Sequence, residues 1–95
     1  MLPPDDEIDL HECYPGELRM KLLPFLDRGY SEGWEKVNII HGVGEGVLKD
    51  RVWSMLEDLE YIDEFHHASI YDGGRGTTVA VYSKDDGPSG QETDE

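Results

Sequence analysis

The sequence predicts one small α/β domain in which the elements follow the order β-α-β-α-β-β. Two helical stripes of apolar residues support this prediction, each preceded by a short strand-like segment, together with a β-branched segment near the C-terminal end. A chain of 95 residues with 37% hydrophobic residues can enclose one core but not two. Every functional residue is therefore expected to belong to the same folding unit.

The two ends of the sequence are acidic and poor in apolar residues. Residues 1–7 carry three acidic residues and no basic one, and residues 83–95 carry five acidic residues against Lys84, so half of the formal net charge of −14 lies there. Such segments bury too little apolar surface to offset the entropy cost of ordering. We expect disordered tails at 1–7 and 83–95 around a folded domain at 8–82.

The composition also limits the partners. Strong nonspecific binding to duplex nucleic acid relies on Lys and Arg, so the net negative charge argues against it, and any anion site must be local. No stretch approaches the roughly 20 apolar residues of a membrane span, and no basic and apolar leader begins the chain. The lone Cys13 fits a reducing compartment. We expect a cytoplasmic protein with no membrane partner, whose acidic surface could bind another protein.

The first half of the domain contains one predicted strand and one predicted helix. Residues 8–11 alternate as a strand does, which places Asp9 and His11 on one face. The stripe of the first helix consists of Leu18, Leu22, Phe25, Leu26 and Tyr30. Pro24 interrupts this stripe, and a proline costs about 3 kcal/mol inside a regular helix. We therefore expect a kink at Pro24 or a helix broken into two pieces.

The second half contains three predicted strands and the clearer of the two helices. Residues 36–40 form a strand that ends in the glycine-rich loop 41–46. The helical stripe that follows consists of Leu48, Val52, Met55, Leu56 and Leu59. Residues 61–71 are polar enough for an edge strand, and residues 77–82 are β-branched enough for a central one. Residues 72–76 turn between them.

This order of elements predicts where a site should lie. Strands joined through a helix run parallel by right-handed crossovers, so the first three strands end at one edge of the sheet. The end of the first strand, the loop 41–46 and the turn 73–76 all emerge there. Ligands of open α/β sheets bind outside the carboxyl ends of the strands. We therefore expect the site at this edge.

Three motifs on that edge resemble one protein family. They are Asp9-Leu10-His11, residues 39–48 (Ile-Ile-His-Gly-Val-Gly-Glu-Gly-Val-Leu) and residues 73–79 (Gly-Gly-Arg-Gly-Thr-Thr-Val). In this order and spacing they resemble the small MutS-related (Smr) domain family over about residues 7–82. The chain departs from the family pattern at Glu12, where a glycine is usual, and at Pro24.

The resemblance implies both a fold and an activity. The fold is a two-layer α/β sandwich, similar to the C-terminal domain of bacterial translation initiation factor three, with two helices on one face of a four-stranded mixed sheet in the order 1-2-4-3. Members of the family act as endonucleases that nick DNA or cleave RNA. Carried over to this chain, the resemblance touches Asp9, His11, His41, Gly42, Gly44 and the turn 74–76.

The residues themselves favour phosphate binding at this edge. Gly42, Gly44 and Gly46 permit positive φ and close backbone approach, and they lead into a helix N-terminus, whose free N–H groups suit an anion. The further candidates for contact with a phosphate are Gly74, Arg75 and Gly76, with Lys49 and Arg51 as weaker ones. The loop is therefore predicted to cradle a phosphate.

The candidate catalytic residues are Asp9, His11 and His41. Both histidines titrate near neutral pH, so one could accept a proton from a nucleophile while the other donates one to the leaving oxygen. Asp9 could orient a histidine or hold a divalent ion such as Mg²⁺ or Mn²⁺. A purely structural pairing of Asp9 with His11 is an equally weighted alternative. His66 and His67 are left outside the site, because adjacent residues of a strand face opposite sides.

These observations lead to two functional hypotheses. The first is a phosphodiesterase that acts on single-stranded, branched or otherwise exposed nucleic-acid backbone. The second is a noncatalytic module that binds nucleic acid or protein and has lost turnover, for which Glu12 is a sign. No element that reads bases is visible, so DNA and RNA both stay open as partners.

Overall fold

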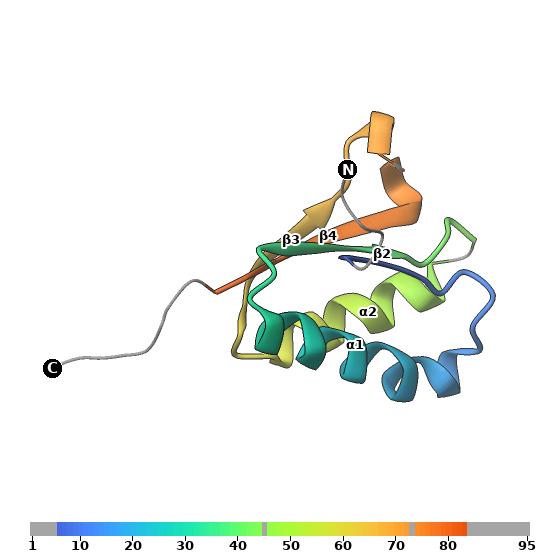
Figure 1. Cartoon of the computed structure of the whole chain (residues 1–95). Helices are drawn as coiled ribbons and strands as arrows, with labels where there is room; N and C mark the ends of the chain where they lie inside the picture. The colour runs from blue at the N-terminus through green and yellow to red at the C-terminus, as the bar shows by residue number, and fades with distance from the viewer. Residues whose placement is uncertain (1–5, 45, 73, 84–95) are drawn as a thin grey trace, which may run out of the picture.

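In the computed structural model, which describes residues 6–44, 46–72 and 74–83, a four-stranded sheet carries two helices on one face (Figure 1). The elements are β1 (Glu7–Asp9), α1 (Leu18–Glu32), β2 (Lys36–Ile40), α2 (Val47–Asp58), β3 (Ile62–His67) and β4 (Thr77–Tyr82). Short 3₁₀ turns lie at Pro15–Glu17, Ile70–Asp72 and Gly74–Gly76. The predicted two-layer β-α-β-α-β-β sandwich is confirmed.

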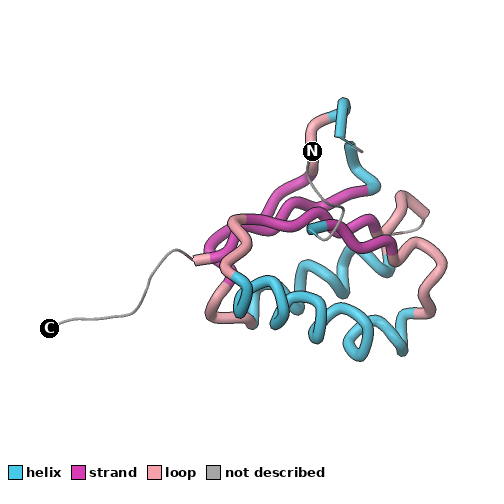
Figure 2. Tube along the Cα trace, viewed as in Figure 1, coloured by secondary structure: helices cyan, strands magenta, loops and turns pink. Residues whose placement is uncertain are grey.

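The strand order of the sheet is β1-β2-β4-β3, as the resemblance implied. β1 pairs parallel with β2, while β4 lies antiparallel to both β2 and β3. β1, β2 and β3 therefore point the same way, and their carboxyl ends share one edge of the sheet. Figure 2 shows the loops that follow β1 and β2 side by side at this end. We call it the site edge.

The core lies between the sheet and the helices. Alternate strand residues such as Val37, Ile39 and Ala80 are buried under the helices, and α1 contributes Leu22 and Leu26, which have no exposed surface. Each fully buried side chain of this size contributes about 1.5–3 kcal/mol. The remaining core residues are Leu10, Cys13, Leu18, Val52, Met55, Leu56, Ile62 and Tyr82. This packing fixes the positions of the strand ends at the site edge.

Two strands are shorter than predicted. The strand expected at 8–11 ends at Asp9, because the main-chain N–H of His11 bonds to the Asp9 carboxylate and turns the chain. The strand expected at 61–71 ends at His67. Beyond it the chain leaves the sheet, and the N–H of Gly74 donates to the carbonyl of Ser69 across the turn. Both corrections come from local hydrogen bonds that hydrophobic alternation does not reveal.

Helix α1 runs unbroken from Leu18 to Glu32, so the prediction of a helix in two pieces is wrong. Pro24 is exposed on the solvent side of the helix, and Met20, one turn before it, is 68% exposed. Pro24 has no N–H, so the Met20 carbonyl lacks its usual helical hydrogen bond. This carbonyl lies on the solvent-exposed side of the helix. The buried stripe on the opposite side holds the helix together.

Replacing Pro24 with Ala is expected to stabilise the protein by about 2 kcal/mol. Proline is about 3 kcal/mol worse than Ala in a helix interior, and about 1 kcal/mol of this is offset because proline stiffens the unfolded chain. Urea unfolding followed by circular dichroism measures the change. An unchanged or lower free energy of unfolding would contradict this account of α1.

The described residues end close to the predicted domain limits. Glu7 opens β1, and the N–H of Ser83 donates to the carbonyl of Tyr61. The tails predicted at 1–7 and 83–95 lie mostly outside the described residues. Within the described part, no helix is both long and apolar enough to cross a membrane.

Candidate functional site

Asp9 and His11 form a hydrogen-bonded pair at the site edge. The His11 main-chain N–H lies 3.1 Å from Asp9 Oδ1, and His11 Nδ1 lies 2.6 Å from the same oxygen. Because an ionised carboxylate only accepts, Nδ1 carries the proton of this bond and Nε2 is left for other partners. Both side chains are about half exposed, and Glu12 Oε2 lies 3.6 Å from Nε2. The structure thus brings two predicted catalytic residues together in the open.

This pairing shifts both residues toward their charged forms. The hydrogen bond from His11 holds the pKa of Asp9 below its ordinary value. The same hydrogen bond, with the charge of Asp9, raises the pKa of His11. An exposed imidazole with a raised pKa suits proton donation near neutral pH.

His41 lies beside the pair but in a different environment. It is 3% exposed, its Nδ1 lies 2.9 Å from the Gly42 carbonyl oxygen, and its Nε2 lies 2.7 Å from Thr78 Oγ1. A carbonyl only accepts, so Nδ1 must be the donor. Nε2 then accepts the hydroxyl proton of Thr78, whose oxygen accepts the Trp53 Nε1–H at 2.8 Å. Both ring nitrogens of His41 are occupied.

The strand pattern explains this burial. His41 continues the alternation of Val37 and Ile39, which places its side chain under the helices, where α2 brings Trp53 and β4 brings Thr78. Burial lowers the pKa of His41, partly offset by its bond to Gly42, so the imidazole is neutral at pH 7. The two predicted catalytic histidines therefore differ in both charge and access.

The glycine-rich loop has the backbone geometry expected of it. Gly42, Gly44 and Gly46 have φ values of 83°, 33° and 86°, a region that L side chains rarely adopt. A Cβ on Gly42 would lie 3.2 Å from His11 Cβ, so only glycine lets the loop come this close to the pair. The Gly76 carbonyl accepts the N–H groups of His41 (3.0 Å) and Gly42 (2.9 Å). All three motifs therefore meet at the site edge.

The loop ends at an uncapped helix N-terminus. Gly46, the N-cap of α2, has no side chain that could cap the helix, so among the described residues it leaves the first-turn N–H groups available to an anion. Lys49, in that turn, lies 4.9 Å over the ring of Trp53. A hollow of about 390 Å³ is lined here by His11, His41, Gly42, Val43, Gly44, Gly46, Val47, Leu48 and Lys49. The predicted phosphate cradle and His11 thus share one hollow.

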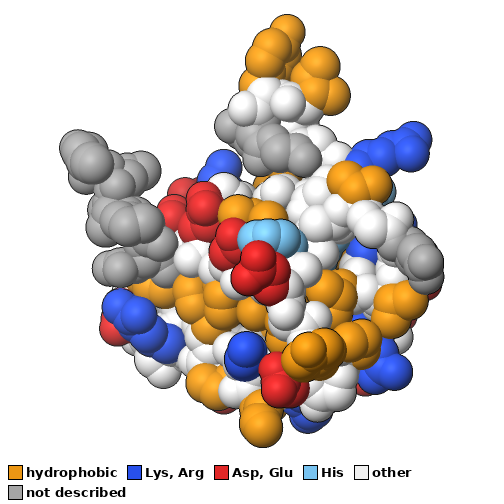
Figure 3. Space-filling view, turned by 90° about the vertical axis from the view of Figure 1, so that its right-hand side faces the viewer, with side chains coloured by type: hydrophobic (Ala, Val, Ile, Leu, Met, Phe, Trp, Pro, Cys, Tyr) orange, Lys and Arg blue, Asp and Glu red, His pale blue; other side chains and the backbone are white. Residues whose placement is uncertain are grey.

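His11 also lines a second hollow. Its volume is about 380 Å³, and it is lined by Asp9, Leu10, His11, Glu12, Cys13 and Lys21. The space-filling view of this end of the molecule has a histidine between acidic side chains at its centre (Figure 3). His11 therefore lines both the hollow that contains Lys49 and one that contains two carboxylates.

The remaining predicted residues lie outside these hollows. Gly74 and the exposed Arg75 form the turn before β4, and Gly76 supports the glycine loop from behind. Arg51 lines a different hollow, between α1 and α2. Within residues 6–44, 46–72 and 74–83, no three His, Cys, Asp or Glu side chains group as metal ligands would. Asp9 as a holder of Mg²⁺ or Mn²⁺ stays a prediction.

Three residues of this site are not predicted from the sequence. Thr78 and Trp53 hold His41, and Lys21 lines the second hollow. One signal was present for Thr78: it alternates with Ala80 and Tyr82, which marks it as a buried polar residue in need of a partner. Lys21 gives no such signal.

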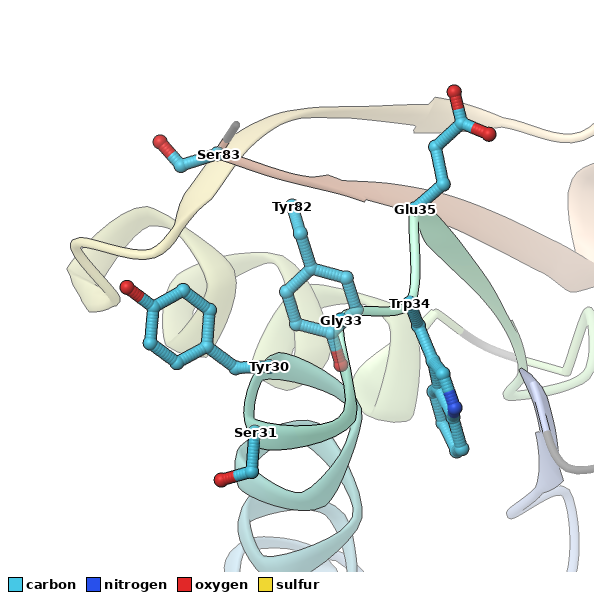
Figure 4. Close-up of a pocket in the computed structure, with 7 residues that line it drawn as sticks. All are labelled: Tyr30, Ser31, Gly33, Trp34, Glu35, Tyr82 and Ser83. Atoms are coloured by element: carbon cyan, nitrogen blue, oxygen red, sulfur yellow. The ribbon is translucent and has the colours of Figure 1, made fainter. Parts of the chain in front are cut away.

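Another hollow lies at the opposite end of the sheet. Its volume is about 800 Å³, and it is lined by Tyr30, Ser31, Gly33, Trp34, Glu35, Tyr82 and Ser83 (Figure 4). The Tyr82 hydroxyl already donates to the Leu26 carbonyl at 2.8 Å, and no histidine lies in the lining. Because its groups are used in packing and it faces the amino end of β2, we do not assign the site here.

Replacing Thr78 with Val is expected to destabilise the protein by about 1–3 kcal/mol, because two buried groups, Trp53 Nε1–H and His41 Nε2, lose their shared partner. Chemical denaturation measures the loss. Thr78→Ser keeps the hydroxyl and should cost less. Equal losses in the two variants would mean that the hydroxyl contributes nothing.

Comparison with known proteins points to one family. The family model described as Smr domain matches residues 8–83. Two proteins named Endonuclease MutS2 are 37% identical over 78 residues (Carboxydothermus hydrogenoformans) and 34% identical over 79 residues (Fusobacterium nucleatum). The matches cover 82% and 83% of this chain but only 10% of each relative. The chain therefore corresponds to a small part of those proteins.

Solved structures share the fold. The crystal structure of the Smr domain of Thermus thermophilus MutS2 matches with a TM-score of 0.78 and 25% identity, covering 81% of this chain and 96% of that one. YdaL, a stand-alone small MutS-related protein from Escherichia coli, matches with a TM-score of 0.82 and 22% identity, covering 86% of this chain and 67% of that one.

Proposed function

Because this chain belongs to the Smr domain family, we propose that it is a nucleic-acid-processing domain that cleaves phosphodiester bonds at exposed backbone of DNA or RNA. The observation that carries this proposal is the open Asp9–His11 pair beside an uncapped helix N-terminus. The endonuclease name of the MutS2 relatives supports it. Since the chain spans only a tenth of those relatives, the activity is proposed for this domain by itself.

The chemistry assigns a role to each group of the site. The first-turn N–H groups of α2 and the Lys49 ammonium hold a phosphate in the hollow that His11 also lines. In cleavage, a nucleophile oxygen bonds to phosphorus and the bond to the leaving oxygen breaks. His11, protonated at Nε2, gives its proton to the leaving oxygen, and the proton of the nucleophile passes to solvent. Asp9 orients the ring and favours its charged form.

His41 serves as a positioning residue. Both of its ring nitrogens are engaged, and its neighbours leave it no access to a reacting proton. By bonding to the Gly42 carbonyl, it fixes the conformation of the loop that leads into α2. The direct catalytic role predicted for His41 from the sequence is thus replaced in this proposal by a supporting one.

A noncatalytic binding module is the second candidate, and Glu12 favours it. Its carboxylate lies 3.6 Å from His11 Nε2, the nitrogen that the mechanism needs, and its negative charge opposes a phosphate there. Such a domain would bind nucleic acid through the glycine loop and leave it intact. A protein partner for the acidic surface is the remaining alternative.

A cleavage panel separates these candidates. The purified protein is expected to cleave at least one of labelled single-stranded RNA, labelled single-stranded DNA and supercoiled plasmid, each assayed with and without Mg²⁺ or Mn²⁺. His11→Ala should lower the rate by about 100-fold or more, because it removes the general acid. Gel electrophoresis of the products measures both rates.

The matched control is His66→Ala, which removes another exposed histidine outside the site. It should cleave at the wild-type rate. Binding without any cleavage would favour the noncatalytic module. Cleavage that survives in His11→Ala, with the fold intact by circular dichroism, would exclude His11 as the general acid.

The pH dependence tests the pairing of Asp9 with His11. The rate is expected to fall as the pH rises through the pKa of His11, because the protonated ring is the active form. Asp9→Asn removes the carboxylate that raises this pKa, so the rate should fall at a lower pH in this variant. Thr78→Val acts through His41 and should lower the rate without changing the pH at which it falls. An unchanged pH–rate profile in Asp9→Asn would contradict the assignment.

A further inference from the structure

The loop between β3 and β4 carries two unusually exposed apolar side chains. Ile70 is 81% exposed and Tyr71 is 91% exposed, the largest values among the exposed large hydrophobic residues that the structure describes. Figure 1 shows this segment standing out from the sheet. Together the two neighbouring side chains form an exposed apolar surface on this loop, which a ligand can cover.

This loop is built into the site edge. The N–H of Gly74 donates to the Ser69 carbonyl at 2.8 Å, and the Gly76 carbonyl holds the glycine loop through His41 and Gly42. A Cβ on Gly76 would lie 3.5 Å from a methyl of Val43. The segment that carries Tyr71 is therefore tied to the backbone that forms the phosphate cradle.

Exposed apolar side chains gather along the whole edge. Of the seven exposed large hydrophobic residues in the described part of the chain, five lie in or next to the loops that follow β1, β2 and β3. They are Tyr14, Val43, Val47, Ile70 and Tyr71. Exposed Arg75 lies in the same β3–β4 loop and makes no ion pair with any described residue.

We propose that Tyr71 stacks on an unpaired base of the nucleic acid whose phosphate the glycine loop holds, while Arg75 contacts a neighbouring phosphate. This inference rests on the proposed function and adds a substrate class to it: single-stranded or locally unpaired nucleic acid. A base in a duplex is covered on both faces by its neighbours, so a ring on a projecting loop reaches only bases that are unstacked. Every base has an aromatic face, so stacking needs no side chains that recognise particular base edges.

The charges favour a nucleic acid over an apolar protein partner. The chain has a formal net charge of −14, yet the cations Lys49 and Arg75 flank the glycine loop without an ion pair to any residue that the structure describes. A ring and a guanidinium carried by the same loop match a base and a phosphate of one strand. A protein partner would pack against the Tyr71 ring but would not need the phosphate-binding glycine loop.

Binding at low salt tests the proposal without depending on turnover. The probes are a labelled single strand, the same strand in a blunt-ended duplex with its complement, and the single strand with abasic sites, each titrated by fluorescence anisotropy. Tyr71→Ala should weaken binding of the single strand about 10-fold and leave the duplex nearly unchanged. Tyr71→Phe, which keeps the ring, should bind like the wild type.

Two further variants test whether the aromatic ring at this position is what binds. Tyr71→Leu keeps apolar surface but has no ring, and it should behave like Tyr71→Ala. Met20→Ala removes an exposed side chain from α1 and should change nothing. The abasic strand should bind the wild-type protein as weakly as the intact strand binds Tyr71→Ala, because each lacks one partner of the stack.

The outcomes distinguish the two proposals. If the wild-type protein neither binds nor cleaves any probe, the proposed function fails and this inference fails with it. If the wild type binds and cleaves but Tyr71→Ala keeps its affinity for the single strand, only the stacking is overturned. Full affinity in Tyr71→Leu, or an equal loss on the duplex, overturns it as well.

Discussion

One threonine hydroxyl connects the layers of this protein at the place where its chemistry is expected. Thr78 Oγ1 accepts the indole N–H of Trp53 and donates to His41, which in turn donates to the Gly42 carbonyl. This chain of bonds runs from α2 through β4 to the glycine loop. A buried polar network is favourable only when every member is satisfied, and here each atom has its partner. The shape of the cradle depends on that condition.

The same type of side chain plays two roles because of its surroundings. His11 is exposed and paired with a carboxylate, so its charged form is favoured. His41, close by, is buried and bonded at both nitrogens, so its neutral form is favoured. Desolvation lowers the pKa of His41, whereas the hydrogen-bonded carboxylate of Asp9 raises the pKa of His11. The two histidines thereby differ in charge and in access to solvent although they lie close together.

Much of the architecture follows from periodicity in the sequence. The stripes of α1 and α2, and the strands at 36–40 and 77–82, lie where apolar and β-branched residues predict them. The ends of β1 and β3 do not, because a side-chain cap at Asp9 and a turn bond at Gly74 stop those strands. The continuity of α1 depends on Pro24 facing water, a property of the packed helix and not of the residue.

For the candidate site, too, some features follow from the sequence and others depend on packing. The meeting of Asp9, His11 and the glycine loop follows from strand direction, which crossover rules supply. The burial of His41 depends on Trp53 and Thr78, residues 12 and 37 positions away in the chain, and composition alone gives no distance between them. Arg75, equally basic in the sequence, turns out to lie outside the hollow that Lys49 lines. Charge identifies candidates, whereas packing decides which of them converge.

The brevity of β1 has a consequence for how the domain behaves as it fluctuates. Three residues pair this edge strand with β2, and the Leu10 N–H adds one bond to the Ile40 carbonyl, whereas the glycine loop is held by the Gly76 carbonyl. Edge segments with few bonds open more readily than the core, in brief excursions far short of global unfolding. We expect an opening of β1 to move Asp9 and His11 away, while the glycine loop keeps its bonds to the Gly76 carbonyl. In such an excursion the proposed phosphate-binding loop would persist without the proposed proton donor.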